Sequence, residues 1–322
     1  MSFKTIRRQA ARISSALLIG ALILSVSASC TNAREYTQVE KNAYFAAIKN
    51  AQTPTQQEVF RGLLAIVPGD DRINAQRLHG EGIRWEAEPG NSRVLVVSFM
   101  SRANYEKYYR DNLEQHQESY ALKKSLWVTV VPEMSWYFSR KPFCPPSEGR
   151  MIQALGLNPA MDYEVLLELW VNPGDLFRPS PDPEITDHES ELAVQIGENQ
   201  WILPSDTNPF VKLDNTQMYM DSAWSTPVTF RDWFVNRAQT IYTTTNEADP
   251  ATWGWPWTRL GYTYDWGNPF SAFGLSEFIL KINPNQNGGE VTVKLEKAVD
   301  ILSSEWNQYF HCGTDDPDAR ND

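Results

Sequence analysis

The sequence predicts an α+β fold, with helices flanking a mixed or antiparallel sheet and long loops between the elements. Runs of apolar residues at 93–99, 126–131 and 165–171 indicate strands. The run Val94-Leu95-Val96-Val97 is apolar on both faces of a strand, which predicts a central position in the sheet. Apolar residues at helical spacing in 36–50 and 229–242 indicate helices.

The remaining elements are expected from local patterns along the chain. The predicted order is a helix at 36–50, a helix over 54–67 that starts at Thr53-Pro54, strands at 82–85 and 93–99, a helix at 104–120, a strand at 126–131, a helix at 148–155, a strand at 165–171, a proline-rich loop at 172–187, strands at 192–196 and 200–203, a helix at 229–242, an aromatic loop at 253–266, and strands at 276–282 and 290–295. Loops of this length are common carriers of function.

The size and composition of the chain are those of a globular protein. Its 322 residues are 42% hydrophobic, 12% aromatic and 21% charged. We expect one α+β domain over 36–314, with a sub-boundary near residue 215 as the alternative, and an acidic tail at 315–322.

The charge balance excludes one class of partner. The chain has 29 Lys and Arg against 40 Asp and Glu, a net charge of −11. Proteins that bind nucleic acid through its phosphates usually present a basic face, so no nucleic-acid partner is expected. After residue 30, no apolar run is long enough to cross a bilayer.

The first 29 residues have the pattern of an export signal. A positively charged start precedes an apolar stretch at 13–26, and Ser27-Ala28-Ser29 lead to Cys30. This junction resembles a bacterial lipoprotein signal. The resemblance implies a lipid on Cys30, a short spacer at 30–35 and a cell-envelope protein anchored to the membrane. The alternative is ordinary cleavage before Cys30 or after Ala33, which would release a soluble periplasmic or secreted protein.

Two further cysteines fit an exported protein. Cys144 and Cys312 form an even pair once Cys30 is lipidated or removed. Because thiols oxidise in the envelope, we expect a disulfide between them. Two unpaired buried thiols are the alternative.

The aromatic loop is the most unusual segment of the sequence. Four of the 12 tryptophans lie within 253–266. Exposed rings could stack on a glycan or a protein, and a guanidinium could bind a carboxylate. The residues that would contact a ligand are Trp255, Trp257, Arg259, Tyr262 and Tyr264. The alternative is that these rings belong to the core.

The densest polar cluster lies in the proline-rich loop. Its carboxylates are oxygen ligands of the kind that Ca²⁺ prefers, although their spacing matches no EF-hand or zinc motif. No cofactor is expected, with a divalent cation such as calcium as the alternative. The candidates for acid–base catalysis are Asp182, Glu184, Asp187, His188 and Asp265.

Common catalytic motifs are missing from the sequence. No GxSxG, SxxK, Walker or GxGxxG element occurs, and the four histidines have no zinc-type spacing. A pair such as Asp265 with Glu277 could serve glycoside cleavage only at a suitable separation, which the sequence does not give.

Two segments carry a resemblance. The stretches LLELWVNPGDLFRPSPDPEITD (166–187) and WPWTRLGYTYDWGNPFSAFGLSEF (255–278) are similar to an uncharacterised group of bacterial lipoprotein-like proteins. The resemblance implies no activity, only that the two segments work together.

Three functions are consistent with these observations. The first is an envelope protein with a binding or structural role through the aromatic and acidic loops. The second is an envelope hydrolase that acts on glycan or another polymer with loop carboxylates. The third is an anchored inhibitor of a basic partner.

Overall fold

The structure, a computed structural model, describes residues 34–69, 82–139, 144–197, 200–208, 228–282, 291–310 and 312. The leader with Cys30, the region around 215 and the tail at 315–322 lie outside these residues. Contacts divide the chain into Met1–Asn32 and Ala33–Asp322, and every described residue belongs to the second unit. No helix within the described ranges is long and apolar enough to cross a membrane.

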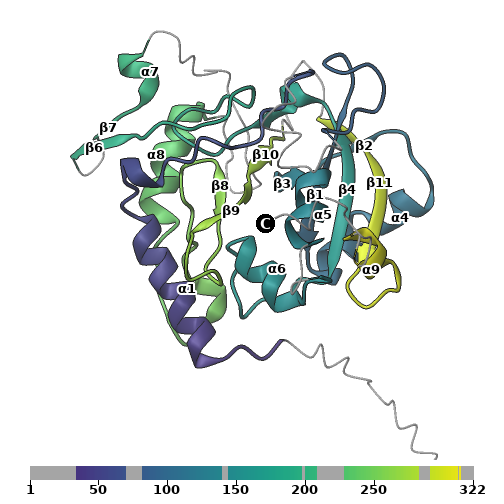
Figure 1. Cartoon of the computed structure of the whole chain (residues 1–322), viewed down its shortest axis with the longest axis horizontal. Helices are drawn as coiled ribbons and strands as arrows, with labels where there is room; N and C mark the ends of the chain where they lie inside the picture. The colour runs from purple at the N-terminus through teal and green to yellow at the C-terminus, as the bar shows by residue number, and fades with distance from the viewer. Residues whose placement is uncertain are drawn as a thin grey trace, which may run out of the picture. The chain divides into compact units, whose positions relative to one another are not determined.

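An antiparallel sheet of seven strands forms the centre of the fold (Figure 1). The strand order is β2 (Tyr120–Ala121), β11 (Thr292–Asp300), β4 (Val165–Val171), β1 (Val94–Met100), β3 (Leu126–Val130), β10 (Phe278–Leu280) and β5 (Leu176–Phe177). Strand β1 pairs with β4 along its whole length, from Val94 opposite Val171 to Met100 opposite Val165. The α+β prediction is therefore confirmed, and the sheet is antiparallel rather than mixed.

Helices and short hairpins surround this sheet. The helices are α1 (Gln38–Ala51), α3 (Arg102–Tyr108), α4 (Arg110–Glu114), α5 (Val131–Ser139), α6 (Glu148–Ala154), α7 (Pro204–Thr207), α8 (Phe230–Thr240) and α9 (Glu305–Tyr309), with 3-10 turns η1 (Gln56–Glu58), η2 (Pro173–Asp175) and η3 (Pro250–Thr252). Two hairpins lie outside the main sheet, β6 (Val194–Gly197) with β7 (Gln200–Ile202) and β8 (Tyr262–Tyr264) with β9 (Phe273–Ser276).

Both faces of the sheet are buried, because consecutive side chains of β1 enter different cores. Leu95 and Val97 join the core formed with α1, α5, α6, α8 and α9. Val94 and Val96 join a second core with residues of α4 and the loop after β2 on the other face. Figure 1 accordingly shows helices α5 and α6 on one side of strands β4 and β11, with helix α4 on the opposite side. This arrangement agrees with the central position predicted for β1.

Three predicted elements differ from the structure. The expected strand at 82–85 is a single bridge between Trp85 and Val94, and the expected helix at 104–120 is divided into α3 and α4, which end at Glu114. The expected helix at 54–67 is a single 3-10 turn, η1, followed by an extended segment. Residues 63–66 are all buried, whereas a surface helix would bury only one side of such a run. Their backbone is bonded instead to a later loop at 178–191, which we call the acidic loop. Leu63 N donates to His188 O at 2.9 Å, and Ile66 N donates to Ile185 O at 2.7 Å.

The expected disulfide is present. Cys144 and Cys312 are joined, with Cα atoms 5.5 Å apart. The bond links the segment before α6 to the residues after α9, which are 168 positions apart in the sequence.

Candidate functional site

The acidic loop, residues 178–191, is folded around Arg178. This arginine is completely buried. Its Nε donates to Glu184 O at 2.9 Å, and its Nη2 donates to Asp187 O at 3.0 Å and to Leu64 O at 3.2 Å. Burial lowers the pKa of Arg178 to about 10, so the side chain is still charged at neutral pH. A buried cation therefore fixes the course of the loop through main-chain oxygens.

The sequence of the loop explains why it can turn so tightly. Prolines at 179, 181 and 183 fix the backbone φ angle at alternate positions. Between them, the Ser180 hydroxyl donates to Asp182 O, and Asp182 Oδ1 accepts from Glu184 N at 3.2 Å. These local bonds fix the backbone around Asp182 and Glu184.

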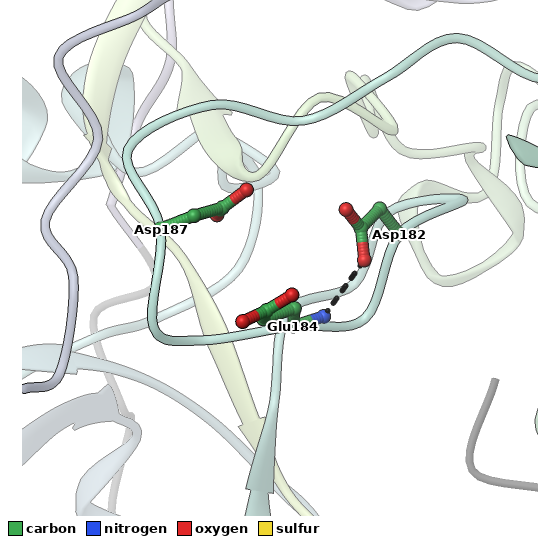
Figure 2. Close-up of side chains that lie close together, drawn as sticks. All are labelled: Asp182, Glu184 and Asp187. Carbon is green, nitrogen blue, oxygen red and sulfur yellow. Dashed lines mark hydrogen bonds between the residues drawn. The ribbon is translucent and has the colours of Figure 1, made fainter. Parts of the chain in front are cut away.

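The carboxylates of Asp182, Glu184 and Asp187 converge. Each offers an oxygen, and the three oxygens lie within 4.8 Å of one another. Figure 2 shows the three side chains facing a common space, with the Asp182–Glu184 hydrogen bond at its edge. Asp182 is buried, Asp187 is partly buried and Glu184 is exposed, so the cluster extends from the interior to the surface. These residues could hold a divalent cation, because carboxylate oxygens are the ligands that Ca²⁺ prefers.

A fourth carboxyl group, Glu191, was missed by the sequence analysis. Burial, a hydrogen bond with Asp182 and the charge of Asp182 together raise the pKa of Glu191 to about 8. Burial also raises the pKa of Asp187 to about 6, against the opposing effect of Arg178. At neutral pH the site therefore holds a protonated Glu191 together with an ionised Asp187. Nothing in the residue pattern distinguished Glu191 from the other acidic residues of the loop.

His188 has a positional role in the same loop. Its Nδ1 lies 2.8 Å from Leu63 O, and because a carbonyl oxygen only accepts, Nδ1 is the donor in this contact. Together with the bond from Leu63 N to His188 O, this contact fastens the acidic loop to the extended segment at 63–66. Glu189 and Arg61 add a surface ion pair at 2.9 Å between the same two segments.

Asp265 lies in a different environment from the other catalytic candidates. Its Oδ1 accepts from Arg150 at 2.8 Å and from Gly267 N at 3.1 Å, and its Oδ2 accepts from Tyr137 at 2.7 Å and again from Arg150. The side chain is fully buried, and its partners come from α5, α6 and its own turn. The structure therefore does not bring Asp265 to the acidic loop and gives it the geometry of a structural ion pair.

The aromatic loop does not form the expected shelf of exposed rings. Trp257, Arg259 and Tyr262 are 4% exposed or less. Each has a polar atom bonded inside the fold: Trp257 Nε1 donates to Pro179 O at 2.9 Å, Arg259 Nη2 to Gln52 O at 2.6 Å and Tyr262 Oη to Glu58 O at 3.0 Å. The buried Arg259 Nε has no hydrogen-bond partner among the described residues. Burial of a large ring that finds a partner for its polar atom stabilises the fold more than exposure does.

The two remaining aromatic candidates are partly exposed. Tyr264 donates from its hydroxyl to Asn50 Oδ1 at 2.9 Å, and Trp255 packs at the edge of the core with its backbone N bonded to Ile241 O. The prediction was a stacking surface that these rings would share with Trp257. Because Trp257 is buried, the two partly exposed rings do not form that surface.

The acidic and aromatic loops are nevertheless packed together. Besides the Trp257–Pro179 hydrogen bond, Gly261 lies against Arg178, where a Cβ atom would come within 2.6 Å of Arg178 Cδ. Gly261 has φ +76°, which also favours glycine. Strand β5, which lies within 166–187, also pairs with β10, which starts at the last residue of 255–278, with Phe177 opposite Ile279.

A second polar group lies behind the aromatic loop. Burial raises the pKa of Glu277 to about 8, against the opposing charge of Arg237. The Glu277 Oε2 atom is enclosed and makes no hydrogen bond to the described residues. Nearby, Tyr242 donates to Trp257 O at 2.7 Å. Asp265 instead has its side-chain partners on α5 and α6.

Comparison with known proteins gives no relative from which a function could be inferred. No family model, no curated protein and no solved structure matches this chain.

Proposed function

We propose that the protein is exported to the cell envelope, is anchored there by a lipid on Cys30, and acts as a hydrolase on glycan or another polymer. The export pattern of the leader supports the location, as does the disulfide, because such bonds persist in oxidising compartments. The acidic loop supports the activity. A binding role through the aromatic loop has less support, because most of its rings are buried.

The observation that carries the hydrolase proposal is the convergence of Glu184 and Asp187. Both reach the surface of the loop, and they belong to the set of oxygens that lie within 4.8 Å of one another. Retaining glycosidases hold their two carboxyl groups about 5 Å apart, whereas inverting ones separate them by more than about 6.5 Å to admit a water. Because their oxygens lie within 4.8 Å, the pair is too close for an inverting reaction, which leaves a retaining one.

The two carboxyl groups have different environments, which assigns their roles. Asp187 is partly buried and has a pKa of about 6, so it donates a proton to the leaving oxygen. Exposed Glu184 attacks the sugar carbon, and water then releases the product while Asp187 takes back a proton. Arg178 holds the loop in this geometry through its hydrogen bonds to Glu184 O and Asp187 O.

Hydrolysis can be tested with the mature protein, a panel of soluble glycans and isolated cell-wall polymer, with release of reducing ends as the measurement. Asp187→Asn and Glu184→Gln should each lower kcat/KM at least about 100-fold. Glu189→Gln is the matched control, because Glu189 is in the same loop but pairs with Arg61 at the surface. Because the acid must be protonated, kcat/KM should fall as pH rises above about 6. No release from any polymer, or release that survives both substitutions, would refute the proposal.

A second function, binding of a divalent cation, is favoured by the same span of oxygens. Ligand oxygens on opposite sides of Ca²⁺ are about 5 Å apart, close to the span of the cluster. Calorimetric titration with CaCl2 tests this directly. If the wild type shows binding heat that Glu184→Gln lacks, and the protein has no hydrolytic activity, then cation binding would replace hydrolysis as the proposed function. An absence of binding heat at millimolar CaCl2 would exclude the cation.

A further inference from the structure

The point at which the chain leaves the folded domain is firmly held. Arg34 is the first described residue. Its backbone N donates to Asp162 Oδ1 and its Nη1 to Pro159 O, both at 3.2 Å, and its Nη2 bonds to Glu40 in the first turn of α1. The loop between α6 and β4 and the start of α1 therefore lie together around the exit of the N-terminal segment.

The distance from this exit to the proposed anchor is short. Arg34 is four positions after Cys30 in the sequence. An extended chain advances about 3.5 Å per residue, so Arg34 can be at most about 14 Å from a lipidated Cys30. A bilayer that holds the lipid must lie against this end of the domain.

Two strongly apolar side chains are exposed next to Arg34. Val39 is 77% exposed in the first turn of α1, and Met161 is 39% exposed beside Asp162. A third, Leu302, is 85% exposed just after β11. It belongs to the same end because its neighbour Ile301 donates from its backbone N to Glu164 O at 2.9 Å, close to Asp162.

Phe270 is 95% exposed on the turn between β8 and β9. That turn is held by α6, because Asp265 pairs with Arg150 and Gly267 packs against Gln153. Helix α6 in turn starts beside the exit, where Gly149 packs against the side chain of Arg34. Phe270 is therefore carried by elements that contact the exit point.

We propose that Val39, Met161, Phe270 and Leu302 form an anchor-side face, which rests on the lipid bilayer and inserts these side chains among the headgroups. The proposal depends on the lipid anchor proposed above. Apolar residues that are exposed singly are ordinary, but these four lie on segments connected to the exit by the contacts given above. The other two large apolar side chains exposed in the described ranges, Val194 and Ile196, are on the β6–β7 hairpin, which Figure 1 shows away from α6 and α9.

Insertion at this face is apolar rather than electrostatic. The charged residues at this end include Glu164 and Asp300, and both pair with Arg102. Arg102 is therefore held by two carboxylates instead of being available to attract anionic lipid. Apolar side chains that enter the interface would add to the membrane affinity of the lipid and would fix the orientation of the domain.

The orientation can be measured with the mature lipidated protein in phosphatidylethanolamine–phosphatidylglycerol vesicles. The disulfide and the lipid occupy the three native cysteines, so a new cysteine can be labelled selectively. A fluorophore at Phe270→Cys or Leu302→Cys should be quenched by brominated lipid at least about 3-fold more strongly than one at Ile196→Cys, the control. The order should be unchanged when phosphatidylglycerol is omitted. Urea unfolding of each variant shows that the exposed substitution leaves the fold intact.

Flotation of the same vesicles separates the two proposals. Protein that does not float lacks the anchor, which refutes the location proposed above. Protein that floats with equal quenching at all three positions is anchored but not oriented, which overturns the anchor-side face. A dimer in solution, with Phe270 and Leu302 protected from lipid, would also overturn it by assigning the face to a second copy.

Discussion

Replacing Glu191 by glutamine should make the stability of the protein less dependent on pH. The pKa of Glu191 is about 8 in the folded protein, against an ordinary value of 4.5. Because the folded state binds the proton more tightly than the unfolded state, this residue makes stability fall as pH rises from about 4.5 to 8. Each pKa unit corresponds to about 1.4 kcal/mol, which gives a ceiling near 5 kcal/mol. Solvent screens this partly exposed side chain, so we expect about 2 kcal/mol.

Urea unfolding at pH 5 and pH 8.5 measures this effect, with the disulfide kept intact. Glu191→Gln should match the wild type within about 0.5 kcal/mol at pH 5, where the wild-type carboxyl group is protonated, and should be about 2 kcal/mol more stable at pH 8.5. Glu189→Gln is the control, since its surface ion pair with Arg61 should give little difference at either pH. An equal effect of Glu191→Gln at both pH values would refute the reasoning, because a lost packing contact does not titrate.

Three further predictions concern the stability of the domain. Gly261→Ala should lower the free energy of unfolding by about 3 kcal/mol, because φ is +76° and Arg178 fills the space beside Gly261. The control Gly69→Ala, with φ +74° and open surroundings, should lower it by about 1 kcal/mol in the same urea titration. Equal losses would contradict the contact with Arg178. Asp265→Asn should lower the free energy of unfolding by about 3 kcal/mol, because the charge of Arg150 is then incompletely paired. Adding Arg150→Met should restore part of that loss. A double variant that is less stable than Asp265→Asn alone would contradict this prediction. Reduction of the disulfide should lower the free energy of unfolding by at most about 5 kcal/mol, given its 168-residue separation, and an unchanged urea midpoint in reducing agent would contradict the estimate.

Elements with a strong local signal were predicted well. Strand β4 spans 165–171 as expected, and α1 and α8 begin within two residues of their predicted starts. Both helices have a threonine N-cap, Thr37 and Thr229, whose side chains accept from backbone N–H groups three residues later. Such caps act within one turn, so the residues that fix these boundaries are neighbours in the sequence.

Elements that depend on distant partners were predicted poorly. Residues 63–66 have the apolar content of a helix face, but their backbone is bonded to His188 and Ile185, more than 100 residues later. Helix α5 was not predicted because it follows β3 without a break and its first residues are apolar like the strand. Local propensity does not decide between the alternatives in such segments, because the decisive hydrogen bonds are formed across the fold.

The sequence alone was enough to predict the class of fold, the disulfide partners and the loop that carries the clustered carboxylates, because apolar periodicity, cysteine number and local composition are properties of neighbouring residues. Only the tertiary structure separated Asp265 from Asp187, added Glu191 to the site and buried Trp257 and Arg259. These outcomes depend on which groups lose water and which find a partner on folding. Burial and pairing are decided by contacts between segments far apart in the chain, and these contacts also determine the pKa of each carboxyl group.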